Sequence, residues 1–180
     1  IKYQIIKDEI VLCYTVSNVD DKEMLFSIGA HPGFRCPLLK GEKLEDYYIE
    51  FEKKETLGKF VLKDGLIDDK KEKFVENENI VSLNKELFKN DAVVLENIKS
   101  NSISLKSRTS GKSIKVEIPG FPYVGIWSTY EGGDFVCIEP WYGVADSVNS
   151  SQDFKDKKGI MKLQKGEKFN CSFKIEISNE

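Results

Sequence analysis

SISLKSRTSGKSIKVEIP, residues 102–119, is the stretch that decides the fold. It holds two short runs of alternating apolar and polar residues, 102–107 and 113–118, separated by the turn-forming residues TSGK at 109–112. A period of two places every second side chain on the same face of a strand, and the glycine permits a tight reversal of the chain. This stretch therefore predicts two antiparallel β-strands joined by a turn.

The same pattern recurs along almost the whole chain, interrupted by short groups of turn-forming residues. Helical periodicity is nearly absent, and only LNKELFKN (83–90) suits a turn or two of helix. About eleven or twelve short strands without crossover helices predict an all-β protein, a large antiparallel β-sandwich. The other predicted strands are YQII (3–6), EIVLCYTVSN (9–18), EMLFSIGA (23–30), DYYIEFE (46–52), GKFVL (58–62), NIVSL (79–83), AVVLEN (92–97), VGIWST (124–129), DFVCIEP (134–140) and FNCSFKIEI (169–177).

Length and composition fit one globular domain spanning residues 1–180. The chain is 40% hydrophobic and 32% charged, and no apolar stretch approaches the roughly 18 residues that a membrane-spanning helix needs. The formal net charge of −3 argues against nucleic acid as the main partner, because phosphate contacts need a basic face. We therefore expect neither a nucleic-acid nor a membrane partner. The most charged segment, 63–79, is expected to form an exposed hairpin or loop within the domain.

The cysteines Cys13, Cys36, Cys137 and Cys171 are widely spaced and form no CxxC pair. Because zinc sites normally use closely spaced ligand pairs, we expect no metal site. Cys13, Cys137 and Cys171 lie in strand-like runs, where a small reduced core side chain is the expected role. Reduced cysteines, together with a charged start that does not resemble a signal peptide, indicate a cytoplasmic protein.

The only histidine of the chain, His31, stands in IGAHPGF (28–34). Imidazole is the side chain that ordinarily gives and takes a proton near neutrality. Pro32 favours an extended backbone at His31 and Gly33 permits a tight turn, an arrangement that would present the ring at a strand end. A turn histidine can equally serve only to hydrogen-bond a backbone carbonyl, so this stretch alone leaves both roles open.

A second reactive group, Glu139, ends the apolar run of FVCIEPW (135–141). A carboxylate at the inner end of a core strand is destabilised by desolvation unless it is paired or functional. Partial burial would raise its pKa and make it a general base near neutrality, whereas a strand-end glutamate pointing to solvent would have neither property. Trp141 and Tyr142 follow directly, and aromatic rings beside carboxylates suit sugar binding. Trp127, inside an apolar run, is expected in the core.

An acid and a base at a sugar-sized site limit the classes of reaction that the site could catalyse. Glycoside hydrolysis normally needs two carboxylates around the scissile bond, whereas a histidine–glutamate pair suits proton transfer at two oxygens of one small molecule. No GxSxG sequence supports a serine esterase. A nucleophilic pair of Cys36 and His31 has no supporting signature.

FSIGAHPGFRCPL (26–38) and CIEPWYGVADS (137–147) resemble the two characteristic motifs of the aldose 1-epimerase (galactose mutarotase) family. The resemblance is greatest to its LacX-like bacterial subgroup, which shares GAHPGF and EPW.G..D almost letter for letter. It covers essentially the whole chain and implies a galactose mutarotase-like supersandwich with a sugar-binding cleft. Family enzymes interconvert the α and β anomers of free hexoses without a metal or organic cofactor.

The resemblance implies a role for individual residues. His31 corresponds to the acid that protonates the ring oxygen, and Glu139 to the base that takes the proton of the anomeric hydroxyl. Asp91, in NDAVVLE (90–96), resembles an aspartate that binds sugar hydroxyls. Trp141, Phe34 and Arg35, within the two motifs, are further candidates for substrate binding, and Arg35 would suit the phosphate of a phosphorylated hexose.

The resemblance begins well inside the family sequence, so we expect a C-terminal piece that lacks roughly the first third of a typical member. Such a piece would leave sheet edges unpaired unless another chain covers them, and a homo-oligomer is one expected arrangement. The expected activity is that of an aldose 1-epimerase. The alternatives are a carbohydrate-binding or regulatory protein without turnover, an epimerase for a hexose phosphate, and a structural β-sandwich in which His31 and Glu139 are incidental.

Overall fold

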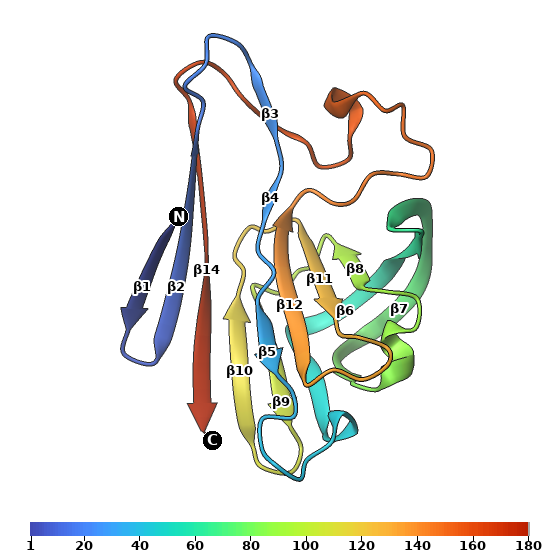
Figure 1. Cartoon of the computed structure of the whole chain (residues 1–180). Coiled ribbons are helices and arrows are strands. Elements are labelled where there is room, and N and C mark those ends of the chain that lie inside the picture. Colours follow the sequence, from blue (N-terminus) through green and yellow to red (C-terminus); the bar gives the residue numbers. More distant parts are fainter. Residues whose placement is uncertain (180) are drawn as a thin grey trace.

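Alternating apolar side chains fold into antiparallel strands in the computed structural model, which describes residues 1–179 (Figure 1). The three helices of this part of the chain are single 3₁₀ turns, η1 (Leu44–Asp46), η2 (Lys85–Phe88) and η3 (Phe154–Asp156). The strands are β1 (Lys2–Ile6), β2 (Glu9–Ser17), β3 (Met24–Phe26), β4 (Ile28–Gly29), β5 (Gly33–Arg35), β6 (Tyr47–Lys63), β7 (Leu66–Ser82), β8 (Val93–Glu96), β9 (Ser102–Ser107), β10 (Lys112–Glu117), β11 (Tyr123–Trp127), β12 (Phe135–Tyr142), β13 (Met161–Leu163) and β14 (Lys168–Asn179). The all-β prediction is confirmed.

Twelve strands form one curled sheet in the order β1-β2-β14-β10-β9-β6-β8-β11-β12-β4, with β5 also paired to β12 and β7 to β6. Strands from both ends of the chain lie side by side, because β14 pairs with β2 from Lys168↔Ser17 to Glu176↔Glu9 (Figure 1). The remaining strands, β3 and β13, form a separate two-stranded ribbon. The two strands predicted within residues 102–119 form β9 and β10, paired as predicted through Ile114↔Leu105.

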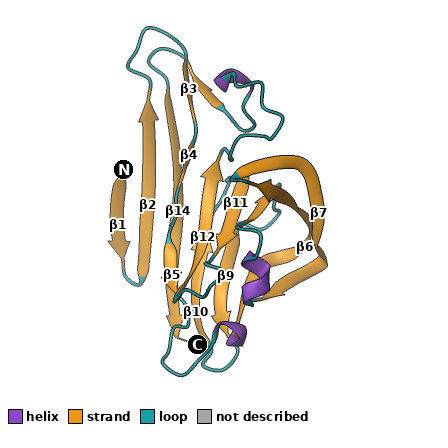
Figure 2. Ribbon diagram, turned by 45° about the vertical axis from the view of Figure 1, so that its right-hand side comes forward, coloured by secondary structure: helices purple, strands orange, loops and turns teal. Residues whose placement is uncertain are grey.

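Two predicted strands merge in β6, and the charged segment 63–79 lies mostly in β7, its partner. The two strands form a long hairpin whose turn lies at Asp64 and Gly65, so the segment 63–79 supplies the turn and most of one strand, and β6 supplies the other strand. Several irregularities in the β6–β7 register bend the hairpin, and this lets β6 pair with β9 near one end and with β8 further along. The hairpin curves around one side of the sheet (Figure 2).

The two faces of the sheet carry different apolar clusters. The larger one fills the inner face of the curl and includes Val124 and Ile126 of β11 together with Ile138 of β12. The smaller one lies on the other face and contains Phe60, Ile67, Val94, Tyr123 and Val144, against which Trp141 packs. Strands β8 and β11 thus contribute to both clusters, which explains why their sequences are almost continuously apolar.

A buried carboxylate joins the bend of β6 to the loop before β9. The Glu55 side chain is fully buried, and its Oε1 accepts hydrogen bonds from the backbone N–H groups of Lys99 and Ser100 and from the Ser100 hydroxyl, at 3.0, 2.8 and 2.7 Å. An acceptor with three donors, two of them in buried hydrogen bonds, is expensive to remove, because buried donors then lose this partner without reaching water.

We therefore predict that Glu55→Ala lowers the free energy of unfolding by about 3 kcal/mol. Glu55→Gln keeps an acceptor oxygen at the same place and is expected to lose only about 1 kcal/mol. Urea unfolding followed by tryptophan fluorescence measures both variants. Equal losses in the two variants would contradict the assignment of Glu55 as an acceptor for this loop.

The described part of the chain contains no helix that is long and apolar enough to cross a membrane.

Candidate active site

The side chains of β12 alternate between the two faces of the sheet. Val136, Ile138 and Pro140 point to the inner core and are fully buried. The alternate residues Cys137 and Glu139 lie on the opposite face, because successive side chains of a strand point to opposite sides. Alternation along one strand therefore places Glu139 outside the main core and toward the smaller cluster.

His31 lies in the loop between β4 and β5, directly opposite Glu139. β12 pairs with Gly29 at Trp141 and with Gly33 at Cys137, and this register continues through His31 to Glu139. Backbone hydrogen bonds from Ala30 N–H to the Pro140 carbonyl and from Ile138 N–H to the Pro32 carbonyl, at 3.0 and 3.4 Å, fix the loop on both sides of His31. The two motifs thus meet as antiparallel neighbours.

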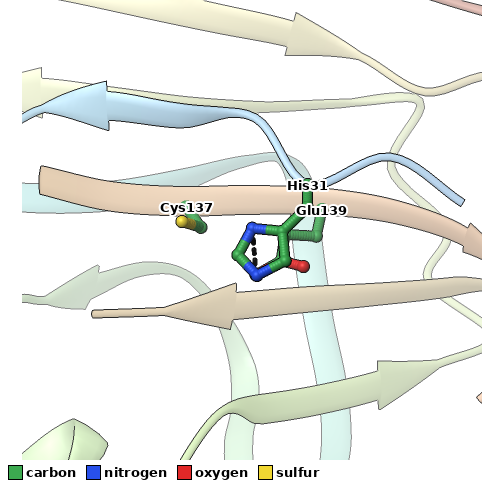
Figure 3. A group of neighbouring side chains, drawn as sticks. All are labelled: His31, Cys137 and Glu139. Carbon is green, nitrogen blue, oxygen red and sulfur yellow. Dashed lines mark ion pairs between the residues drawn. The ribbon is translucent and has the colours of Figure 1, made fainter. Parts of the chain in front are cut away.

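The His31 and Glu139 side chains form an ion-pair contact, with 3.4 Å between Nδ1 and Oε1 (Figure 3). Their environments are unequal: the imidazole is 64% exposed and the carboxylate only 3%. Burial raises the pKa of the Glu139 carboxyl to about 7, the Trp141 side chain offsets part of this rise, and the Asp91 carboxylate adds to it. The Trp141 indole N–H also donates a hydrogen bond to the Ala30 carbonyl at 3.2 Å. A carboxyl group in this state exchanges a proton near neutrality.

Glycines on the neighbouring strands make room for the Trp141 indole. A Cβ atom on Gly29 or on Gly125 would lie 2.5 Å from the ring. Both glycines flank β12, since Gly29 pairs with Trp141 and Gly125 pairs with Glu139. The indole therefore lies flat across three strands beside the carboxylate, and side chains larger than hydrogen at these positions would displace it.

We predict that Gly125→Ala lowers the free energy of unfolding by about 1–3 kcal/mol, because the new methyl group overlaps the Trp141 ring. Gly33→Ala is the matched control, since its Cβ would meet nothing closer than the Cys137 Sγ at 3.5 Å. This variant is expected to stay within about 0.5 kcal/mol of the wild type. Urea unfolding measures both, and equal stability of the two variants would contradict the close approach at Gly125.

Two cavities of about 340 and 320 Å³ meet at His31, Glu139 and Trp141. Both volumes lie within the range of small-molecule sites, about 300–1,000 Å³. The first cavity is also lined by Ser27, Ile28, Gly29, Ala30, Tyr142, Gly143 and Val144. The second is also lined by Leu62, Gly65, Ile67, Asp91, Ala92, Val94, Trp127 and Ala145. The imidazole, the buried carboxylate and an aromatic surface thus share one cleft.

The tip of the β6–β7 hairpin forms a wall of the second cavity. The Ile67 N–H donates to the Asp146 carbonyl and the Val148 N–H donates to the Ile67 carbonyl, both at 2.9 Å. These bonds fasten the hairpin to the loop that follows β12. Residues 62–67 are not predicted at the site, because they are more than 20 positions from either motif and the ones that line the cavity, Leu62, Gly65 and Ile67, carry no reactive group.

The structure brings His31, Glu139, Asp91 and Trp141 to the same cavity. Asp91 is exposed in the turn before β8, and its Oδ1 accepts from the Ala92 N–H at 2.8 Å. Phe34 lies elsewhere: it is 8% exposed and belongs to the inner core cluster. A shift of one residue along a strand reverses the face, and this separates Phe34 from Gly33.

Arg35 lies on the same sheet face as Cys137 but further from Glu139, opposite Phe135 in β12. It is exposed and lines neither cavity. Cys36, considered as a partner of His31, is fully buried in the inner core. Phe34, Arg35 and Cys36 therefore remain outside the cleft.

Trp127 lines the second cavity, which differs from the expected core position. Its ring stands edge-on to the His31 imidazole, with 5.9 Å between the ring centroids. The alternation of β11 explains the difference, since Val124 and Ile126 occupy the core and Trp127 points to the other face. Cys137, expected as a core residue, lies close to both His31 and Glu139. The three side chains each offer a ligand atom within 4.8 Å of the other two.

A curled antiparallel sheet with a buried carboxylate and an imidazole in a cleft on its face defines a protein of the galactose mutarotase-like fold. The chain belongs to the aldose 1-epimerase family, whose sequence model matches residues 1–162. Protein LacX of Lactococcus lactis subsp. lactis is 37% identical over 170 residues, covering 92% of this chain and 57% of LacX.

Solved structures agree with this assignment. A galactose mutarotase related enzyme from Lactobacillus acidophilus superposes with a TM-score of 0.91 at 31% identity, covering 98% of this chain and 59% of that chain. A galactose mutarotase-like protein from Lactobacillus casei gives a TM-score of 0.89 at 28% identity, covering 98% and 61%. The chain thus spans somewhat more than half the length of these relatives.

Proposed function

We propose that the chain carries the catalytic acid–base pair of a mutarotase that interconverts the α and β anomers of a free hexose. The observation that carries the proposal is the 3.4 Å contact of the exposed His31 imidazole with the buried Glu139 carboxylate in one cleft. The anomeric carbon bears both the ring oxygen and the hydroxyl group, so a base and an acid that act on these two oxygens must lie close together.

The proposed reaction moves one proton at each of these two oxygens. The Glu139 carboxylate takes the proton of the anomeric hydroxyl, and His31, in its protonated form, gives a proton to the ring oxygen. The bond between the anomeric carbon and the ring oxygen breaks, and the free aldehyde forms. The aldehyde group then rotates so that the opposite face of its carbonyl carbon meets the ring-closing hydroxyl. Ring closure reverses both proton transfers and yields the other anomer. Both side chains return to their starting states, and no cofactor is consumed.

The remaining cavity residues suit a sugar. Trp127 and Trp141 offer aromatic faces for the C–H groups of a pyranose, and Asp91 offers a carboxylate for its hydroxyls. Arg35, the side chain that would suit a phosphate, lines neither cavity. A free hexose is therefore the substrate class that we propose.

Polarimetry on freshly dissolved α-D-galactose and α-D-glucose tests the proposal. We expect the chain to accelerate the decay of optical rotation to its equilibrium value in proportion to its concentration. Isothermal calorimetry on the same sample measures sugar binding. Binding without acceleration would instead support a carbohydrate-binding protein of the same fold. The absence of both binding and acceleration would contradict any sugar role for this cleft.

The pH dependence of the rate follows from the state of Glu139. Because only the ionised carboxylate can take a proton, kcat/KM is expected to rise through the pKa of about 7, and it is expected to fall again at higher pH because His31 must carry a proton to act as the acid. Asp91→Asn should move this rise to lower pH, since the Asp91 charge contributes to the raised pKa of Glu139. Initial rates across the neutral range measure both effects. A rise centred at the ordinary value of 4.5 would contradict the assignment of the buried carboxyl as the base.

A further inference from the structure

Cys137 adds a third potential ligand beside the acid and the base, and the proposed reaction does not use it. Its Sγ, a His31 ring nitrogen and a Glu139 carboxylate oxygen all lie within 4.8 Å of one another (Figure 3). Cys137 and Glu139 are two residues apart on β12 and share a face, and His31 approaches from the loop that pairs with them. Among the described residues, this is the group of histidine, cysteine and carboxylate side chains that could hold a metal ion.

These three donor types suit a borderline-soft divalent cation. Zinc binds thiolate sulfur at about 2.3 Å and imidazole nitrogen and carboxylate oxygen at about 2.0–2.2 Å, which sets neighbouring ligand atoms about 3.3–3.6 Å apart. The 3.4 Å between Nδ1 of His31 and Oε1 of Glu139 already fits this spacing. A largely exposed imidazole can make the remaining adjustment, because His31 is 64% exposed and meets Trp127 only edge-on.

We propose that His31, Cys137 and Glu139 form a binding site for Zn²⁺ or a cation of similar softness, and that this cation excludes the sugar from the acid–base pair. The fourth position of a tetrahedral ion would face the cleft, where water can occupy it. On binding, the S–H bond of Cys137 breaks and its proton passes to solvent as the sulfur–metal bond forms. The nitrogen and oxygen ligands use lone pairs that the proposed reaction needs, so metal and sugar bind in competition.

The spacing of the three ligands in the sequence does not match the usual pattern of a zinc site. Structural zinc sites usually draw pairs of ligands from one short segment, whereas His31 is separated from Cys137 and Glu139 by more than 100 residues. The antiparallel register of the β4–β5 loop with β12 brings them together instead. The sequence therefore predicts no metal site, although the fold assembles three ligands.

Cobalt is the probe for the test, because Co²⁺ takes the geometry of Zn²⁺ and a thiolate–cobalt bond absorbs in the near ultraviolet. The full chain, reduced and free of metal, is titrated with CoCl₂ at about pH 8, because metal binding displaces protons from its ligands and is favoured by mildly alkaline conditions. We expect a saturable charge-transfer band with one Co²⁺ per chain, abolished by an equimolar amount of ZnCl₂. This readout does not depend on mutarotase activity, so failure of the metal site is distinguishable from failure of the proposed function.

Three variants test whether the charge-transfer band comes from Co²⁺ bound at the proposed site. Cys137→Ser should remove it, whereas Cys13→Ser, which alters a cysteine on β2, should leave it unchanged. His31→Gln changes an exposed side chain with little risk to the fold and should weaken Co²⁺ binding by about tenfold or more. Absence of a thiolate band in the wild type, its persistence in Cys137→Ser, or its loss in Cys13→Ser would overturn the proposal.

Discussion

Glu139→Gln is expected to lower kcat for mutarotation by about 10³-fold, since general acid–base catalysis by a positioned side chain contributes about 10²–10⁴-fold. Glutamine keeps the shape and volume of the buried side chain but cannot take a proton from the anomeric hydroxyl. The change in optical rotation of fresh α-D-galactose, corrected for the spontaneous rate, measures the effect.

The same substitution is expected to stabilise the protein above neutral pH. The folded-state pKa of Glu139 is raised from 4.5 to about 7, so the folded chain holds this proton more tightly than the unfolded chain does. The ionised carboxylate therefore lowers stability as the pH rises from 4.5 through about 7, by about 3 kcal/mol in total. Glutamine does not ionise, so the variant should match the wild type below pH 4.5 and exceed it at pH 8. Loss of stability together with activity at pH 8 would instead mark Glu139 as a structural residue.

His31→Asn is expected to reduce kcat by about 10²-fold or more while leaving the fold unchanged. The imidazole is 64% exposed, and surface substitutions usually change stability by less than about 0.5 kcal/mol. Asparagine can still donate a hydrogen bond but cannot deliver a proton to the ring oxygen. Polarimetry and thermal unfolding of the same preparation separate catalysis from stability.

Arg35→Gln is the matched control for His31→Asn. Arg35 lies four residues along the same segment, is also exposed and lines neither cavity. Its substitution should change neither the rate nor the stability. If both variants lost activity equally, or if His31→Asn kept the full rate, His31 would not be the acid.

The sequence predicted the strands well because alternation is a local property. β9 and β10 follow their sequence pattern, and the turn residues between them mark the reversal. The pattern predicted less well where tertiary pairing decides the outcome. β6 continues through Glu55, whose fully buried carboxylate accepts hydrogen bonds at Oε1 from the loop before β9, a contact that no local pattern reveals. The hairpin of β6 and β7 therefore appeared from sequence as separate shorter strands.

The sequence predicted the site residues that carry a local chemical signal and missed those that only tertiary pairing brings to the cleft. His31 and Glu139 stood out because each carries a titratable group at the end of an apolar run. Trp127 was expected in the core because a strand that is apolar on both faces does not show which face lines a cavity. Phe34 and Arg35 were selected by their position in a motif, and the structure places one in the inner core and the other outside both cavities. The hairpin tip at Leu62 and Ile67 carried no chemical signal, since its role depends on long-range pairing.

Exchange spectroscopy tests the central claim most directly, because it follows the interconversion of anomers at equilibrium. The anomeric proton of α-D-galactose is saturated by selective irradiation, and the signal of the β anomer is recorded by NMR. We expect saturation to pass to the β anomer in the presence of the wild-type chain and to fall to the buffer level with Glu139→Gln. A folded wild-type chain that binds the sugar but transfers no more saturation than buffer would contradict the assignment of His31 and Glu139 as a working acid–base pair.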